Sequence, residues 1–323
     1  MRHLRIVPEQ TNINFFRYWK VFFFGSVGMM VVSVVVFLLL GLNFGIDFRG
    51  GTTIRSESSQ PLDVGAYRSA IAPLGLGDVS IAEVFDAGFD TTRNVAMIRV
   101  QAQDDTGSMS PAEIAAIEAV LKEIDPDVRF ASVESVGPKV SGELVRTAVI
   151  AVMLAILGIG FYVWMRFEWQ FSVGAVIGLT HDAILTIGMF SLLQIRFDLP
   201  IIAAILAIVG YSINDKVVIF DRVRENLGKY KKRPLLDILN LSINETLSRT
   251  LMTSGTTLIA LIALLVLGGD VLRSFVFAIC WGVVIGTYSS VFMAAQSLIF
   301  LGVKREWGKP ATDAGTQFAD GAK

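Results

Sequence analysis

Six long apolar stretches divide this chain and restrict what it can fold into. They cover approximately residues 21–42, 147–165, 171–195, 199–221, 250–267 and 274–301. At about 1.5 Å of rise per residue, each is long enough to cross a hydrocarbon core of about 30 Å as a helix. The composition agrees, because 53% of the residues are hydrophobic and only 18% are charged, against about 25% in soluble domains. The sequence therefore predicts a polytopic α-helical membrane protein with six transmembrane helices.

Positive charges gather in three segments that six spans would place on one side of the membrane. They are the N-terminal residues 1–20, the loop 222–248 after the fourth span, and the tail 303–323. By the positive-inside rule this side is cytoplasmic. The first span, 21–42, is too long for a typical signal peptide and lacks a small-residue cleavage site, so we expect an uncleaved anchor. The tail is polar and rich in Gly, Pro and Ala, and we expect it to be unstructured.

Residues 43–142 then lie outside the membrane, in a periplasmic position, and they predict one compact α+β domain. Patterns of alternation and helical spacing favour the order β-α-β-β-α-β, the ferredoxin-like arrangement. The elements are expected near residues 52–57, 62–74, 79–85, 94–101, 110–124 and 128–136. Ser110-Pro111-Ala112-Glu113 has the pattern of a capping box with a proline at the first helical position. The segment is acidic and contains no cysteine, so we expect neither a nucleic-acid partner nor a disulfide.

Two interpretations remain open for the amphipathic run that follows Pro234. Apolar residues recur from 235 to 243, directly after a basic stretch. This pattern is typical of a helix lying on the inner membrane surface. An extension of the fifth span beyond the membrane would show the same pattern.

A polar turn interrupts the fourth span and is the strongest functional signal. Within Gly210-Tyr211-Ser212-Ile213-Asn214-Asp215, the carboxylate alone costs roughly 2.5–3.5 kcal/mol at mid-membrane. Such a residue usually faces the interior of a helix bundle or a water-filled path and takes part in the transfer of protons, ions or substrate. Asp215 lies about 24 Å along its span from residue 199, and Arg249 lies about 27 Å from the outer end of the fifth span. The two therefore reach similar depths, and an Asp215–Arg249 pair is predicted, either as a proton-dependent switch or as a permanent structural ion pair.

Other polar residues surround this pair. Tyr211 and Ser212 lie four and three residues before Asp215 and share its helix face. On the fifth span, Arg249 forms a stripe with Thr253 and with Thr256 or Thr257. Together they predict a polar path into the bundle, although such hydroxyls also bond their own backbone simply to pack helices.

The third span contributes His181 and Asp182 near its centre. Adjacent residues cannot share one helix face, so Asp182 is either a second relay carboxylate or a structural hydrogen-bonding group. With two histidines and one cysteine, Cys280, in the chain, neither a metal site nor a cofactor is expected.

Small residues define two further sites. In the sixth span Gly282, Gly286 and Ser290 belong to a small-xxx-small face suited to close helix packing, within the protein or against a partner. At the outer end of the first span, a linker motif contains Gly45, Asp47, Gly50 and Gly51. Its glycines permit a tight or positive-φ turn, and the motif is interpreted as a hinge or a linker anchor. No phosphate loop or nucleophile motif is found, so an enzyme is not expected.

Three motifs together resemble the SecD/SecF family, which belongs to the RND group of proton-driven membrane proteins. They are residues 45–51, residues 210–215 with Val217–Arg222, and Leu247–Thr250. The resemblance extends over nearly the whole chain. A single short outer domain and the Ile-Asp-Phe at 46–48 favour the SecF branch over the SecD branch.

The resemblance implies an accessory subunit of the bacterial inner-membrane Sec machinery. Its expected partners are SecD, YajC and the SecYEG channel with the SecA motor, and its expected clients are unfolded secretory polypeptides. It would use the proton gradient in late steps of export. Asp215 and Arg249 match the family's charged transport residues, Asn214 lies in the same motif, and Asp182 matches a polar third-span position. Lys216 departs from the pattern, because the family often has threonine there.

Two other functions are consistent with the same residues. The chain resembles half of a proton-driven RND-type exporter of small molecules or lipids, which would need a second half. It would alternatively be a scaffold held together through the small-residue face of the sixth span. Loss of the Asp215 charge would harm an exporter and leave a scaffold intact.

Overall fold

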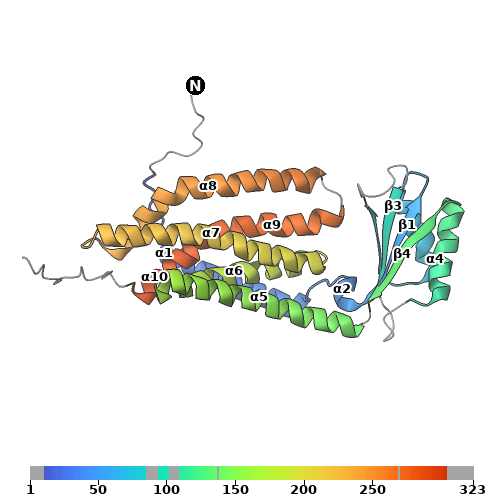
Figure 1. The fold of residues 1–323 in the computed structure, drawn as a ribbon, viewed down its shortest axis with the longest axis horizontal. Coiled ribbons are helices and arrows are strands. Elements are labelled where there is room, and N and C mark those ends of the chain that lie inside the picture. Colours follow the sequence, from blue (N-terminus) through green and yellow to red (C-terminus); the bar gives the residue numbers. More distant parts are fainter. Residues whose placement is uncertain (1–10, 85–93, 102–108, 137, 268–269, 304–323) are drawn as a thin grey trace, which may run out of the picture.

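The computed structural model describes residues 11–84, 94–101, 109–136, 138–267 and 270–303. A bundle of long helices carries a small sheet domain, residues 51–136, at one end (Figure 1). The predicted unstructured tail and the first ten residues of the N-terminal segment lie outside the described residues.

Six helical segments are long and apolar enough to cross a membrane, as the sequence predicts. The first is α1 (Trp19–Leu40), and four more are α5 (Pro138–Arg166), α6 (Trp169–Leu193), α7 (Leu199–Lys229) and α8 (Leu235–Leu267). The sixth consists of α9 (Asp270–Ser289), a π-helical turn η2 (Ser290–Ala294) and α10 (Ala295–Leu301). The π-turn was not predicted from the sequence.

Burial divides these helices into an inner and an outer set. About half of the apolar window is buried in α6, α7 and the sixth segment, at 56%, 44% and 50%. In α1 and α8 only 6% and 11% is buried. The outer helices expose many large apolar side chains, such as Leu39, Ile259 and Val266, as expected of surfaces that face lipid or another membrane chain. The inner helices therefore provide the interior in which polar side chains are placed.

The helix α8 settles the open question about the amphipathic run. It continues without a break from Leu235 to Leu267, and Ile238, Leu239 and Ile243 are buried in a core cluster with α7. Residues 11–13 also bond this part of α8, since the amide of Asn244 contacts Thr11 and Ile13 at 2.8 Å. The run is therefore an extension of the fifth span packed within the protein, and the surface-helix interpretation is wrong.

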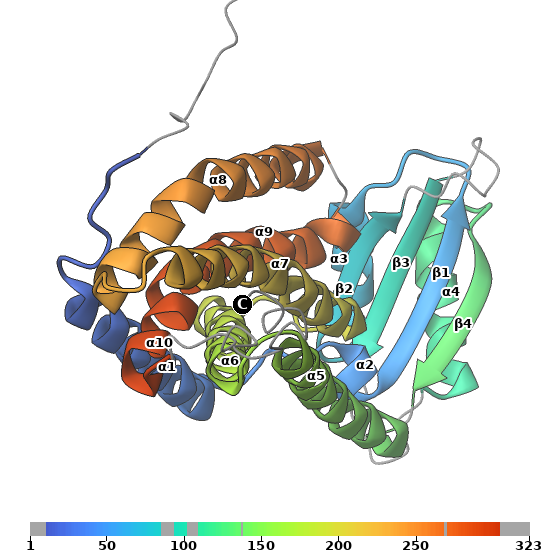
Figure 2. The same ribbon diagram turned by 60° about the vertical axis from the view of Figure 1, so that its left-hand side comes forward.

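The sheet domain has the predicted split βαβ topology. Its strands are β1 (Gly51–Ser58), β2 (Val79–Val84), β3 (Asn94–Gln101) and β4 (Arg129–Val136), in the order β2-β3-β1-β4 with antiparallel neighbours. The helices α3 (Val64–Ile71), with a 3₁₀ turn at Ala72–Leu74, and α4 (Pro111–Ile124) share a core with one face of the sheet. The predicted capping box is present, with Ser110 and Glu113 bonding each other's backbone. The other sheet face is turned toward the bundle (Figure 2).

The linker between α1 and the sheet is fixed to the turn between α6 and α7. Phe44 and Phe197 form a parallel bridge, and the short helix α2 (Ile46–Arg49) follows. Gly50 and Gly51 have φ angles of 82° and 152°, which confirms the predicted positive-φ turn. Gly45 matters for a different reason, because a Cβ there would overlap the side chain of Asp198. The sheet domain is thus seated on the bundle as well as tethered to it.

Candidate functional site: a buried charge network

A lysine–aspartate pair lies at the centre of the bundle. Lys216 Nζ of α7 is 2.9 Å from Asp182 Oδ2 of α6, and both side chains are completely buried. Taking two charges out of water costs several kcal/mol each, and the pair is tolerated only when its remaining hydrogen-bonding capacity is satisfied.

Both members of this pair are fully engaged. Lys216 directs its ammonium at Asp182, at Ser289 Oγ of α9 (2.9 Å) and at Ser212 Oγ, which uses its three donors. Asp182 also accepts from Ser212 Oγ at 2.6 Å, and its Oδ1 lies 3.1 Å from His181 Nδ1. Gly178 makes room for the lysine stem, since a Cβ there would overlap Lys216 Cε. The pair is therefore held in a fixed position between α6, α7 and α9.

Depth counting along the helices does not find this pair. Asp182 lies about 16 Å from the end of α6 nearest the sheet, whereas Lys216 lies about 25 Å from the corresponding end of α7. The Cα–Cβ bonds of a helix tilt toward its N-terminus, so the long lysine side chain runs back past Ser212 and covers the difference. Sequence reasoning identified Lys216 only as a departure from the family pattern, and it missed Ser289.

An aromatic and hydroxyl layer continues the network toward α1. The His181 ring stacks on Tyr288 with centroids 6.2 Å apart, and the Tyr288 hydroxyl lies 2.8 Å from Ser26 Oγ. Within the described residues His181 Nε2 is buried without a hydrogen-bond partner. Tyr288 and Ser289 directly precede the π-turn η2, and such turns occur often at functional sites. The polar network thus joins α1, α6, α7 and α9.

Asp215 differs from Asp182 in its surroundings. Its side chain is buried, with 3% of the residue exposed, yet Oδ2 has no hydrogen-bond partner among the described residues. The ion pairs found in the described part of the chain do not include one between Asp215 and Arg249, and Arg249 and Asn214 are exposed on the bundle surface. The predicted Asp215–Arg249 bond is therefore not formed in this conformation, and Asp215 is the carboxylate left available.

The predicted polar path is present in part. Tyr211 and Thr257 approach across α7 and α8, with their oxygens 3.4 Å apart. Ser212 turns instead toward Asp182. Thr253 and Thr257 donate to backbone carbonyls of their own helix at 3.0 and 2.8 Å, as hydroxyls commonly do when they pack helices. The half-buried Tyr211–Thr257 contact joins the two helices at this level.

The small residues of the sixth span pack inside the protein. Added Cβ atoms would overlap Ile208 at Gly282 and crowd Ser212 at Gly286, so both glycines let α9 approach α7 closely. Ser290 is buried, donates to the Thr287 carbonyl at 2.7 Å, and begins the π-turn. This face holds α7 against α9 at the level of the charge network.

The linker residues meet at the start of α7. Asp47 Oδ2 accepts a hydrogen bond from the Leu199 backbone N–H at 3.0 Å, which satisfies one free donor of that helix end. Gly45 N–H donates to the Phe197 carbonyl at 3.0 Å. These contacts attach the predicted hinge to the helix that carries Ser212, Asp215 and Lys216. Within the described residues, acidic, histidine and cysteine side chains form no cluster able to hold a metal ion.

The fold and this network define a class: a multi-pass membrane protein with one ferredoxin-like domain and a buried charge network between its inner helices. Residues 116–304 match the family profile described as protein export membrane protein SecD/SecF, C-terminal, and residues 35–61 match the SecD/SecF GG motif. The chain belongs to the SecD/SecF family.

Relatives cover nearly the whole chain. The protein translocase subunit SecF of Cereibacter sphaeroides is 60% identical over 98% of both chains, and that of Vibrio alginolyticus is 40% identical over 94% of both. Among solved structures, the crystal structure of SecDF, a translocon-associated membrane protein from Thermus, aligns with a TM-score of 0.75 and 33% identity over 92% of this chain. A super-membrane-facing form of SecDF aligns with a TM-score of 0.69 at 34% identity over 90% of this chain. The chain spans 39% of the length of these two SecDF chains.

Proposed function

We propose that this chain uses the proton gradient across the bacterial inner membrane to drive late steps of polypeptide export as a SecF-type subunit. The observation that carries the proposal is the contrast between two carboxylates in adjacent inner helices. Asp182 is saturated by Lys216, Ser212 and His181, whereas Asp215 Oδ2 is buried without a partner. A carboxylate with a free oxygen at this depth can take up and release a proton without first breaking a bond, so Asp215 is the proposed proton carrier.

Arg249 and Asn214 then belong to the moving part of the cycle. Both are exposed on the bundle surface beside Asp215 along α7 and α8. In the proposed cycle, ionised Asp215 is drawn to Arg249, and protonation releases it. Asp182 is assigned to holding the inner helices together.

A SecD-like chain is the proposed partner on this face. Exposed polar groups such as Asn214 and Arg249 are costly against lipid, and a second set of membrane helices would cover them. The 39% coverage of the SecDF chains supports the need for a complementary half. YajC, SecYEG with SecA, and unfolded secretory polypeptides complete the proposed assembly. The helix α10, the last helix of the described chain, lies at the bundle end opposite the sheet domain (Figure 1). Ile13, near the other described end, bonds Asn244 in the cytoplasmic extension of α8. Both observations support cytoplasmic termini and a periplasmic sheet domain.

The test is proton-gradient-dependent export by Asp215→Asn in cells that depend on this chain. Asp221→Asn is the matched control, because Asp221 lies on the same helix but is exposed and pairs with Arg166 at 3.6 Å on the surface. We expect Asp215→Asn to reduce export to the level measured after the gradient is collapsed, at unchanged protein abundance, whereas Asp221→Asn exports normally. Normal export by Asp215→Asn would refute the proposal. Drug sensitivity without accumulation of secretory precursors would instead identify an RND-type exporter.

A further inference from the structure

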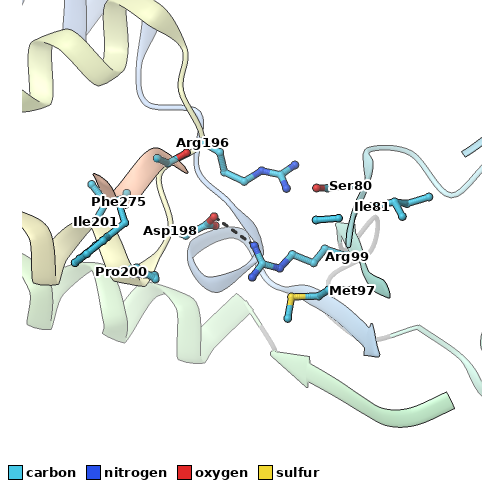
Figure 3. Close-up of a pocket in the computed structure, with 11 residues that line it drawn as sticks. Ser80, Ile81, Met97, Arg99, Arg196, Asp198, Pro200, Ile201 and Phe275 are labelled. Atoms are coloured by element: carbon cyan, nitrogen blue, oxygen red, sulfur yellow. Dashed lines mark hydrogen bonds and ion pairs between the residues drawn. The ribbon is translucent and has the colours of Figure 1, made fainter. Parts of the chain in front are cut away.

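A cavity separates the open face of the sheet from the end of the helix bundle. Its volume is about 250 Å³, and its walls come from β2, β3, the turn before α7, and the first residues of α7 and α9. Figure 3 shows Met97 and Arg99 of the sheet on one side and Asp198, Pro200 and Phe275 on the other. The sheet domain therefore rests on the bundle across a partly hollow interface.

Ion pairs bridge this interface in two places. Arg99 Nη1 of β3 lies 3.5 Å from Asp198 Oδ2 (Figure 3), and the two side chains are 26% and 15% exposed. Arg196, in the same turn as Asp198, lies 3.9 Å from Asp78, just before β2. The second pair is the more exposed, so Asp198 and Arg99 form the stronger contact across the cavity.

The carboxylate of Asp198 lies where burial disfavours a negative charge. Its Oδ1 is buried without a partner among the described residues, pressed against the Gly45 backbone. Burial raises the pKa of the Asp198 carboxyl above its ordinary value, and the nearby Asp47 adds to this, while Arg99 and Arg196 oppose it. Burial thus disfavours the ionised form of Asp198, and Arg99 and Arg196 offset part of that cost.

The position of Asp198 connects three parts of the molecule. It directly precedes Leu199, the first residue of α7, and so begins the helix that carries Asp215 and Lys216. Asp47 of the linker bonds the Leu199 N–H, and Arg99 belongs to β3, one of the two central strands of the sheet. Asp198 therefore moves with α7, and a movement of this helix along or about its axis would displace Asp198 relative to Arg99.

We propose that Asp198 and Arg99 form a latch between α7 and the sheet domain, which holds the cavity closed and opens when α7 moves. The role of the latch depends on the proposed function, because the latch would transmit a protonation change at Asp215 to the sheet domain outside the membrane. Asp198 acts as a positioning residue, and it takes no part in proton transfer.

Thiol labelling of a residue in the cavity wall tests the latch. Ser80 lines the cavity and is half-buried, and the chain has a single cysteine, Cys280, so Ser80→Cys in a Cys280→Ser background gives one reporter. Ser69→Cys is the reference, because Ser69 is exposed on α3, outside the cavity lining. The full-length protein in membranes is labelled with a membrane-impermeant maleimide, and the ratio of the two labelling rates reports cavity opening.

We expect Asp198→Asn and Arg99→Met each to raise this ratio about fivefold, as for a partly exposed pair worth about 1 kcal/mol. The double variant should give the same ratio as either single variant, because the latch is already open in both. Additive increases would indicate two separate local defects and would overturn the latch, as would an unchanged ratio in both single variants. The labelling does not depend on export, so an unchanged ratio rejects the latch whatever Asp215→Asn does to export.

Discussion

Removing one member of the Lys216–Asp182 pair leaves the other charge buried and unpaired. Lys216→Met leaves the Asp182 carboxylate with only Ser212 and His181 as partners. Asp182→Asn leaves the Lys216 ammonium without a counter-ion, in contact with Ser212 and Ser289. Either change should lower the free energy of unfolding by about 3–5 kcal/mol, the usual cost of breaking a fully buried pair. The remaining carboxylate can also gain a proton, and the remaining ammonium can lose one, which removes the buried charge. The loss of about 3–5 kcal/mol in unfolding free energy is therefore an upper value.

The double variant Lys216→Met/Asp182→Asn should be much less harmful. Methionine fills the space of the lysine stem without a charge, and the asparagine still bonds Ser212 and His181. We expect the double variant to remain within about 2 kcal/mol of the parent, so the upper values for the two single variants correspond to a coupling energy of about 4–8 kcal/mol between the two positions.

Equilibrium unfolding of the purified protein in mixed detergent micelles, followed by circular dichroism, measures these free energies. Additive effects of the two substitutions, or single variants that lose less than about 1 kcal/mol, would refute the assignment of a structural ion pair. Export distinguishes the pair from a relay: the double variant should retain gradient-dependent export, whereas a loss as complete as that of Asp215→Asn would make Asp182 part of the proton path.

Two further predictions concern helix packing and the sheet domain. Gly282→Leu should separate α9 from α7 at Ile208 and lower the free energy of unfolding by about 1–3 kcal/mol. The control is Gly158→Leu, which should change the unfolding free energy little, because a Cβ at Gly158 has no neighbour within 4 Å. Equal effects of the two substitutions would contradict the packing role of Gly282. In the sheet domain, hydrogen bonds from Ser58 and backbone N–H groups hold the pKa of Asp125 below its ordinary value. The ionised carboxylate therefore stabilises the domain above about pH 4, and this stabilisation is lost as the pH falls further. Asp125→Asn should therefore increase hydrogen exchange of the sheet-domain peptides at neutral pH by an amount that corresponds to about 1–3 kcal/mol, and protection equal to that of the parent at neutral pH would contradict this.

The local elements of the sheet domain were predictable because each depends on neighbouring residues. The capping box at Ser110 and Glu113, the alternation in β3 and the glycines at 50 and 51 are properties of short segments, and the structure has all of them. The six spans were predictable for the same reason, since hydrocarbon requires long apolar helices wherever they finally pack. The amphipathic run at 235–243 was ambiguous, because a membrane surface and a neighbouring helix select the same apolar spacing.

That costly polar groups lie inside apolar helices is evident from the sequence, and Asp182, Asp215 and Lys216 are among these groups. Which of the groups are partners depends on how the helices pack. Depth along a helix gives one coordinate, whereas contact also depends on the rotation and tilt of each helix and on the reach of its side chains. For that reason Lys216 extends back to Asp182, Arg249 forms no ion pair with Asp215, and Asp198 meets an arginine 99 residues earlier in the chain.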